Sequence, residues 1–449
     1  MATAPARIAA EPLREWAQPL TGEAAGYDPL MDAIGDARVV CLGEATHGTH
    51  EFYRERCVIT RRLVEEKGFT AVAVEADWPD AYEVNRWVRG VSEAATAEAA
   101  LRGFKRFPAW MWRNHDVVEL VTWLRGWNDA LPTGATKVGF YGLDLYSLFT
   151  SIEAVLRYLE TVDPEAAQRA RYRYSCFEHF GEDAQAYGYA ATFGMSRSCE
   201  DAVVQELVEL RRRAAELARR DGRVPEDAYF NAERNAVVIK DAEEYYRTMF
   251  TGRISSWNLR DRHMAETVDA LLKHFDGTTG RRTRIVIWEH NSHVGDARFT
   301  DMGRQGEWTV GQLMREHYGP ETCLVGFTTH RGTVTAASDW GAPAERKRVR
   351  PALPGSYEEL LHDAEIPSFL LTMPSRSEVA ELLAEPRLER AIGVIYLPRT
   401  ERVSHYFHAE LSRQFDAVVH FDETRAVEPL EATAEWHAGE PPETFPTGI

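Results

Sequence analysis

Residues 38–56 read RVVCLGEATHGTHEFYRER, and this stretch decides the fold. It begins with the run VVCL, which is short, partly β-branched and typical of a buried strand. A glycine ends the run, and Glu44, His47 and His50 follow in quick succession, before residues that favour a helix. A carboxylate and two imidazoles thus lie where a core strand passes into a helix. In an open α/β sheet, ligands bind at this edge, outside the carboxyl ends of the strands.

Outward from this stretch, short apolar runs alternate with helical patterns, and the β-α-β-α-β order favours a parallel sheet with helices on its faces. A helix predicted over 49–67 ends at Lys67-Gly68, a typical C-terminal cap. Further helices are predicted to start at Trp78 and to cover about 94–101 and 117–128. The predicted strands are 38–43, 71–74, 138–142, 284–288, 323–328, 334–337, 368–371, 393–397 and 417–421.

Between residues 147 and 279 the strand patterns stop, and long amphipathic helical patterns replace them. The predicted helices of this part are 148–161, 199–220, 226–249 and 258–274. We therefore expect an α/β fold with a mostly parallel central sheet, flanking helices and a helical insertion that covers the carboxyl-end cleft. The predicted parts are a helical N-terminal extension (1–36), the α/β core (37–146 and 280–425), the helical insertion or lid (147–279) and a poorly ordered, proline-containing tail (426–449).

The composition narrows the class of protein. The formal net charge of −18 disfavours a nucleic-acid partner, because a polyanion would be repelled. No apolar run approaches the length of a membrane span, so we expect no membrane partner. The five cysteines are odd in number and show no CxxC spacing, which predicts buried thiols in a reducing compartment rather than a disulfide scaffold. We expect a cytoplasmic protein that is a monomer or a small homo-oligomer.

Ionisable residues follow four of the predicted strands, at the point where each strand ends. Buried carboxylates and imidazoles are costly unless they are paired, so four such endings at one sheet edge favour a functional site over simple packing. These residues are Glu44 and His47, Glu75 and Asp77, Asp144, and finally Glu289, His290 and His293.

Residues of these types can perform hydrolysis. A neutral histidine takes a proton from water near pH 7, and a neighbouring carboxylate orients it and stabilises its cation. A second histidine can donate to the oxygen that becomes negative. The sequence contains no GxSxG elbow, no P-loop and no GxGxxG, and no cysteine lies beside these histidines. Direct attack by an activated water is the simplest interpretation.

The motif LGEATHG at 42–48, together with Arg56, Glu75 and HNSH at 290–293, resembles the erythromycin esterase family. The resemblance spans roughly residues 35–425. It implies a fold with an α/β core and helices that cover the cleft. It also implies a hydrolase that opens ester or lactone bonds with water activated by a histidine and without a covalent intermediate. It further implies that His47 is the general base beside Glu44, that Arg56 and Glu75 belong to the same polar cluster, and that His290 and His293 are the second histidine pair. The resemblance does not specify a macrolide as substrate.

Other residues are candidates for binding the ester or lactone substrate. Polar candidates follow predicted strands or lie in the insertion, and tryptophans could form an apolar wall for a bulky substrate. The full set is His50, Asp144, Arg260, Arg399, His405, Tyr406, Trp78 and Trp110.

Three further interpretations remain open at the sequence level. Glu44-x-x-His47 and His290-x-x-His293 could instead hold zinc, iron or manganese in a metal-dependent hydrolase or peptidase, although we predict no cofactor. The histidines could bind a ligand such as haem without catalysis. The same cleft could also transfer or cyclise an acyl group in a biosynthetic enzyme.

Overall fold

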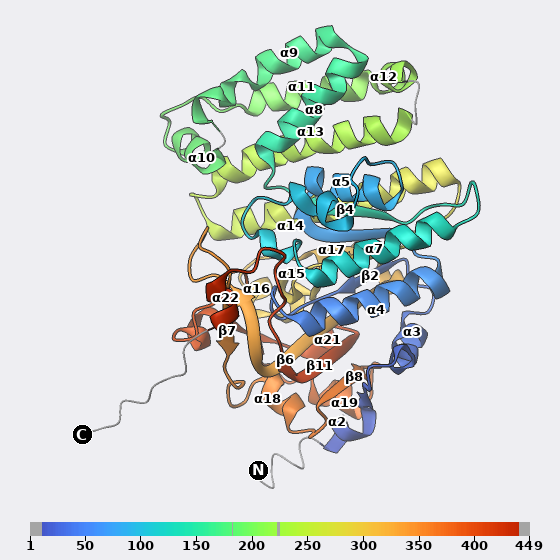
Figure 1. Ribbon diagram of the computed structural model, residues 1–449. Helices are drawn as coiled ribbons and strands as arrows, with labels where there is room; N and C mark the ends of the chain where they lie inside the picture. Colours follow the sequence, from blue (N-terminus) through green and yellow to red (C-terminus); the bar gives the residue numbers. More distant parts are fainter. Residues whose placement is uncertain (1–10, 182, 222–224, 440–449) are drawn as a thin grey trace. The chain divides into compact units, whose positions relative to one another are not determined.

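The computed structural model describes residues 11–181, 183–221 and 225–439 (Figure 1). The chain divides into two compact units. Unit 1 comprises Met1–Val72, Val88–Val138 and Thr283–Ile449, and unit 2 comprises Ala73–Trp87 and Gly139–Arg282. The predicted insertion, 147–279, falls inside unit 2. Its role as a lid stays a prediction.

The strands of unit 1 form a mixed sheet whose central members are parallel. Strand β2 pairs in parallel with β5 and β6, and β6 pairs in parallel with β11, whereas β8, β1 and β7 add antiparallel partners towards the edge. The predicted α/β class, with a large central sheet and flanking helices, is confirmed. In spatial order the strands are β1 (Gln18–Pro19), β8 (Ser368–Thr372), β11 (Ala417–Thr424), β6 (Thr322–Ala336), β2 (Val39–Leu42) and β5 (Ile285–Trp288), with β7 (Glu345–Val349) beside β6.

The stretch that opens the sequence argument folds as expected. All four residues of β2 are fully buried, because neighbouring strands and helices cover both faces of a central parallel strand. Helix α4 (His50–Lys67) follows and ends at Gly68, whose φ of 69° is left-handed and whose N–H donates to the carbonyl of Leu63. Helix α7 (His115–Ala130) packs beside α4 (Figure 1).

The remaining elements of unit 1 are short. A separate two-stranded antiparallel sheet joins β9 (Arg387–Arg390) and β10 (Tyr406–Ala409). The helices are α2 (Glu11–Trp16), α3 (Asp28–Ile34), α6 (Ala97–Ala100), α15 (Asn291–Val294), α16 (Asp301–Arg304), α17 (Val310–Tyr318), α18 (Tyr357–His362), α19 (Glu378–Leu382), α20 (Glu401–Ser404), α21 (Leu411–Gln414) and α22 (Ala434–Ala438); the 3-10 turns are η1 (Ala24–Tyr27), η2 (Leu101–Gly103), η3 (Ala109–Met111), η5 (Ala297–Phe299) and η6 (Gly319–Glu321).

Unit 2 combines two adjacent strands with a helical bundle. Its strands are β3 (Ala71–Asp77) and β4 (Gly139–Asp144). The bundle has its own apolar core. Its helices α8 and α13 pack against each other (Figure 1). The helix predicted over 199–220 is two helices in the structure. The helices are α5 (Trp78–Val88), α8 (Leu148–Val162), α9 (Pro164–Tyr174), α10 (Ala184–Thr192), α11 (Glu200–Arg212), α12 (Ala214–Asp221), α13 (Pro225–Thr248) and α14 (Arg253–Thr279), with the 3-10 turn η4 (Ser175–Phe180).

Two strand predictions need correction. The strands predicted at 323–328 and 334–337 are one strand, β6, which continues through Gly332. At this glycine φ is 148°, and a Cβ atom would lie 2.0 Å from the carbonyl oxygen of Thr424, so only glycine fits beside β11. The strand predicted at 393–397 is absent: Ile392 and Ile395 form only isolated bridges, to Thr46 and Ala337. Local apolar composition favoured a strand there, but no neighbouring strand supplies a continuous partner.

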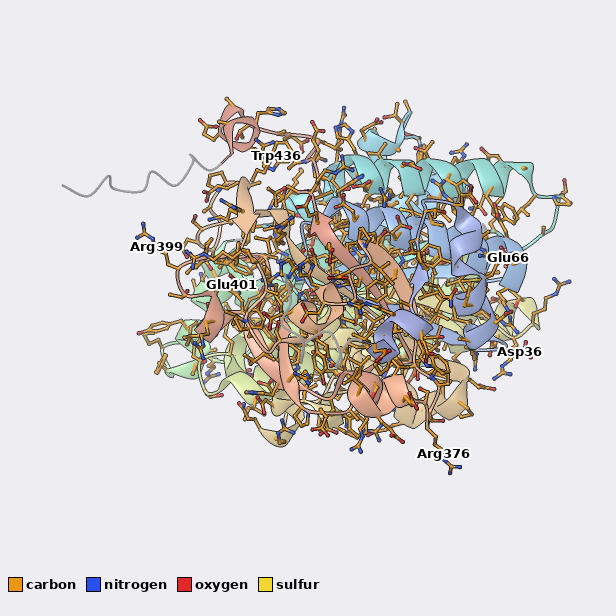
Figure 2. All side chains as sticks on the ribbon, turned by 90° about the horizontal axis from the view of Figure 1, so that it is seen from below. Asp36, Glu66, Arg376, Arg399, Glu401 and Trp436 are labelled. Atoms are coloured by element: carbon orange, nitrogen blue, oxygen red, sulfur yellow. A yellow bond between two sulfur atoms is a disulfide. The ribbon has the colours of Figure 1, made fainter. Side chains whose placement is uncertain are left out.

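The tail is also more ordered than predicted. Residues 426–439 pack on unit 1, where Trp436 of α22 is buried and its indole N–H donates to the Thr335 hydroxyl at 2.9 Å (Figure 2). The rest of the predicted tail, 440–449, lies outside the described residues. Proline content predicted disorder, yet one buried tryptophan is enough to anchor a short segment.

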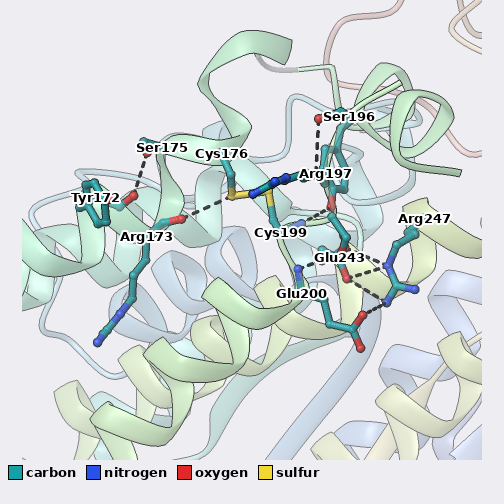
Figure 3. Close-up of a disulfide and its surroundings, with 12 residues drawn as sticks. Tyr172, Arg173, Ser175, Cys176, Ser196, Arg197, Cys199, Glu200, Glu243 and Arg247 are labelled. Atoms are coloured by element: carbon teal, nitrogen blue, oxygen red, sulfur yellow. Dashed lines mark hydrogen bonds and ion pairs between the residues drawn. A yellow bond between two sulfur atoms is a disulfide. The ribbon is translucent and has the colours of Figure 1, made fainter. Parts of the chain in front are cut away.

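The prediction that the cysteines form no disulfide is wrong. Cys176 of η4 and Cys199, the residue before α11, are joined by a disulfide with a Cα–Cα distance of 6.0 Å (Figure 3). They are 23 residues apart in sequence, so no local spacing motif marks them. Cys41, Cys57 and Cys323 are free and buried, and burial raises the pKa of each thiol. Within the described residues, no helix is long and apolar enough to cross a membrane.

Candidate active site

Glu44, His47 and Arg56 form a buried polar group in unit 1. Glu44 lies just beyond the end of β2 and is 2% exposed. Its Oε1 accepts a hydrogen bond from His47 Nδ1 at 2.9 Å, and its Oε2 accepts one from Arg56 Nη2 at 2.6 Å. Because an ionised carboxylate can only accept, the His47 proton resides on Nδ1. The other ring nitrogen, Nε2, therefore carries the lone pair that a general base requires.

Two aromatic rings flank Arg56. It is fully buried on α4, and its guanidinium carbon lies 4.6 Å from the ring centres of both Tyr53 and Trp288. Cation–π contact partly offsets the cost of burying the charge. The rings and the carboxylate together give Arg56 one orientation, and this orientation fixes Glu44 behind His47.

His290 has the opposite hydrogen-bonding pattern to His47. It precedes α15, and its Nδ1 accepts from the backbone N–H of Ser292 at 3.2 Å and lies 2.8 Å from the Ser292 hydroxyl. An accepting Nδ1 leaves the proton of a neutral ring on Nε2. The ring centres of His290 and His47 are 4.8 Å apart. The site therefore contains one imidazole suited to accept a proton beside another suited to donate one.

Asn291, which the sequence analysis did not single out, joins the two histidine-bearing loops. Its backbone N–H donates to the carbonyl of Glu44 at 2.8 Å. Its side-chain amide pairs with the backbone of Phe327 on β6, donating at 2.8 Å and accepting at 3.2 Å. Gly43 approaches the same side chain closely. A Cβ atom at this position would lie 2.2 Å from the Asn291 Oδ1, so a glycine leaves room for Asn291. The HNSH spacing was visible in the sequence, but the role of its asparagine depends on β6.

His293 lies on α15, one turn from His290. It is buried, and its backbone N–H donates to the carbonyl of His290 at 2.8 Å. His293 therefore belongs to the same short helix, and its predicted catalytic role stays a prediction.

Two of the other predicted carboxylates, Asp144 and Glu75, contact one arginine in unit 2. Arg260 of α14 donates to both oxygens of Asp144, at 3.0 and 2.8 Å, and to Glu75 Oε1 at 2.6 Å. The negative charges of Asp144 and Glu75 outweigh the desolvation cost and raise the pKa of Arg260. The guanidinium carbon of Arg260 lies 5.1 Å from the centre of the Tyr146 ring. The structure thus places Arg260 beside these strand ends. Its predicted role in substrate binding and the shared site of this cluster with His47 stay predictions.

Three of the predicted substrate-binding residues are buried or hydrogen-bonded to neighbouring side chains. His50 begins α4 and lies 2.9 Å from Asp116 through Nδ1. Trp78 is buried in unit 2, where its indole N–H donates to Asn231 and its ring stacks near Tyr141. Trp110 is also buried. Both tryptophans are buried, and an apolar wall that they form for the substrate stays a prediction.

The predicted residues near 399–406 do not follow a strand. Arg399 is exposed and projects away from the ribbon (Figure 2). His405 is buried, its Nε2 accepts from the backbone N–H of Leu397 at 3.2 Å, and burial lowers its pKa. The hydroxyl of Tyr406 accepts from the backbone N–H of Leu353, and its ring lies 5.4 Å from the Arg390 guanidinium. The contacts of His405 and Tyr406 therefore support the loop and β10.

Metal ligation was the main alternative for these residues. Among the residues that the structure describes, no group of three or more histidine, cysteine, aspartate or glutamate side chains is arranged to hold a metal ion.

The model of the family described as erythromycin esterase matches residues 64–424. The chain belongs to the erythromycin esterase family. This membership confirms the resemblance based on the sequence motifs, and it supports a hydrolase that acts on esters and takes a small-molecule substrate.

Two similar proteins are distant in sequence from this chain. Erythromycin esterase type II of Escherichia coli is 22% identical over 417 residues, covering 84% of this chain and 93% of that protein. The putative hydrolase YbfO of Bacillus subtilis is 22% identical over 426 residues, covering 90% of this chain and 88% of that protein.

Solved structures share the fold. A succinoglycan biosynthesis protein superposes with a TM-score of 0.75 at 21% identity, covering 95% of this chain and all of that one. A histidine-to-asparagine mutant of the erythromycin esterase EreC, in its open conformation, gives a TM-score of 0.66 at 18% identity, covering 93% and 98%.

Proposed function

We propose that this protein cleaves an ester or lactone bond by attack of a water molecule that His47 activates, without a covalent intermediate. The observation that carries the proposal is the opposite hydrogen-bonding pattern of two neighbouring imidazoles. Glu44 holds the His47 proton on Nδ1, whereas Ser292 leaves the His290 proton on Nε2. Ester hydrolysis needs one group to take a proton and another to stabilise the developing oxyanion.

In the proposed reaction, His47 Nε2 removes a proton from water as the water oxygen attacks the carbonyl carbon. The imidazolium that forms is stabilised by Glu44, whose second oxygen remains bound to Arg56. His290 Nε2–H donates to the carbonyl oxygen as it becomes negative. When the tetrahedral intermediate collapses, His47 returns its proton to the leaving alkoxide, so the base is regenerated.

Ser292 is the residue that could support a covalent route, because its hydroxyl lies 2.8 Å from His290 Nδ1. Its backbone N–H donates to the same nitrogen, so the proposal assigns Ser292 to holding the His290 ring. Ser292→Ala keeps this backbone donor and should retain at least about a tenth of wild-type kcat. A pre-steady-state burst in the wild type that disappears in Ser292→Ala would instead establish an acyl-enzyme.

The experiment for the proposed function is hydrolysis of a panel of aryl esters, lactones and macrolides by wild type and His47→Ala. We expect His47→Ala to lose about 10²–10⁴-fold in kcat, the usual contribution of a general base. His317→Ala is the matched control, since His317 is an exposed histidine of unit 1. Near-normal turnover by a folded His47→Ala protein would refute the proposal. The macrolide arm tests the substrate separately, and the cytoplasmic location stays a prediction.

A further inference from the structure

Glu389 of β9 lies behind the candidate active site and contacts it through Asn291. The Asn291 side-chain N–H group donates to Glu389 Oε1 at 3.3 Å and to the carbonyl of Phe327 at 2.8 Å. The backbone N–H of the same asparagine donates to the backbone carbonyl of Glu44. Glu389 is therefore one residue removed from both Glu44 and the His290 loop, and Asn291 links its side chain to them.

The surroundings of Glu389 disfavour a negative charge. The side chain is fully buried, and among the described residues no hydrogen-bond partner reaches its Oε2. The facing groups are the carboxyl of Glu358 and the phenol of Tyr357, both from α18, and two neutral amides, Asn291 from α15 and Gln414 from α21. The neighbouring Arg390 does not form an ion pair with Glu389. Its guanidinium pairs with Glu401 and donates to the backbone carbonyls of Thr329, His330 and Arg350.

Glu358 adds repulsion without supplying a donor. It is also fully buried, its Oε1 accepts from the backbone N–H of Arg390 at 2.8 Å, and its Oε2 has no hydrogen-bond partner among the described residues. Two buried carboxyls cannot both be charged at low cost, so one keeps its proton. Burial first, and then the charge of Glu358, raises the pKa of Glu389 to about 8.

We propose that Glu389 is a positioning residue of the hydrolytic centre and that it works as a neutral carboxylic acid. This inference rests on the proposed function. A neutral Glu389 accepts weakly from Asn291 and leaves the amide paired with β6. An ionised Glu389 would bind the amide about twice as strongly and draw it away from Phe327. Because Asn291 also holds Glu44, that shift would disturb the geometry of His47 and His290 together.

Glu389→Gln is the informative variant, because glutamine keeps the shape and the accepting oxygen of a neutral carboxyl. The rate arm measures kcat/KM for an aryl ester from pH 6 to pH 10. We expect wild type to lose about tenfold per pH unit above pH 8. Glu389→Gln should stay within about twofold of wild type at pH 7 and lack this alkaline loss. Glu423→Gln, an exposed glutamate of β11, is the matched control and should behave as wild type.

A second arm needs no substrate and separates this inference from the proposed function. The ring signal of His290 is followed by NMR from pH 7 to pH 10 in ¹³C-histidine protein, with the signal assigned by its loss in His290→Gln. We expect an inflection near pH 8 in wild type and Glu423→Gln that is absent from Glu389→Gln. If wild type hydrolyses no ester, the proposed function fails while this arm still decides the inference. No wild-type inflection, an identical inflection in Glu389→Gln, or a tenfold loss of its activity at pH 7 would overturn it.

Discussion

Replacing Glu389 by glutamine should change how the stability of the protein depends on pH. In the unfolded chain the carboxyl titrates near its ordinary value of 4.5, whereas in the folded protein burial and Glu358 raise its pKa to about 8. Between these values the folded state keeps a proton that the unfolded state releases. The stability that this retained proton contributes is therefore fully present below pH 4.5 and is lost as the pH rises towards 8.

The size of the effect follows from the difference between the two pKa values. From 4.5 to about 8 is roughly 3.5 units, and at about 1.4 kcal/mol per unit this predicts a loss of about 5 kcal/mol. Some 4 kcal/mol of this falls between pH 5 and pH 8.5. The glutamine amide cannot ionise, so Glu389→Gln should not lose this stability. The variant should be close to wild type at pH 5 and more stable than wild type at pH 8.5.

Urea unfolding followed by tryptophan fluorescence at pH 5 and pH 8.5 measures this difference. Glu423→Gln controls for removal of a surface carboxylate and should follow wild type at both pH values. If the free energies of unfolding of wild type and Glu389→Gln change in parallel, to within about 1 kcal/mol, Glu389 does not carry a proton into the folded state and the argument fails.

Three other perturbations follow from the structure. Arg56→Leu leaves Glu44 buried without its cation and should destabilise the protein by about 3–5 kcal/mol in urea unfolding; a loss below about 1 kcal/mol would contradict the buried pair. Cys176→Ser removes the disulfide that joins residues 23 apart in sequence and should lower the free energy of unfolding by about 3 kcal/mol in urea unfolding. Thiol titration of the unfolded wild-type protein verifies that its disulfide exists. Treatment with EDTA followed by dialysis should leave ester hydrolysis unchanged, and activity that is lost and then restored by zinc or manganese would move the histidines to ligand roles.

The fold was largely predictable because its signals are local. The run before Glu44, the glycine cap after Lys67 and the loss of strand patterns after residue 147 each depend on neighbouring residues alone, and the structure contains β2, α4 and a helical bundle at these places. The predictions failed where a distant partner decides the outcome. Residues 393–397 have the composition of a strand, but they pair with no neighbouring strand over several residues. Trp436 anchors a segment whose composition predicts disorder.

For the candidate site, the sequence by itself determined the types of chemistry-bearing residues and their order along the chain. Strands that end in Glu44 and His290 must bring them to one edge when they pair in parallel, as β2 and β5 do. The hydrogen-bond partner of each imidazole nitrogen depends on the tertiary structure, because distant segments of the chain determine which group faces each ring. Only the tertiary structure decided the environment of Glu389 and the joining of Cys176 to Cys199, since burial and contact between distant segments arise from packing rather than from local sequence.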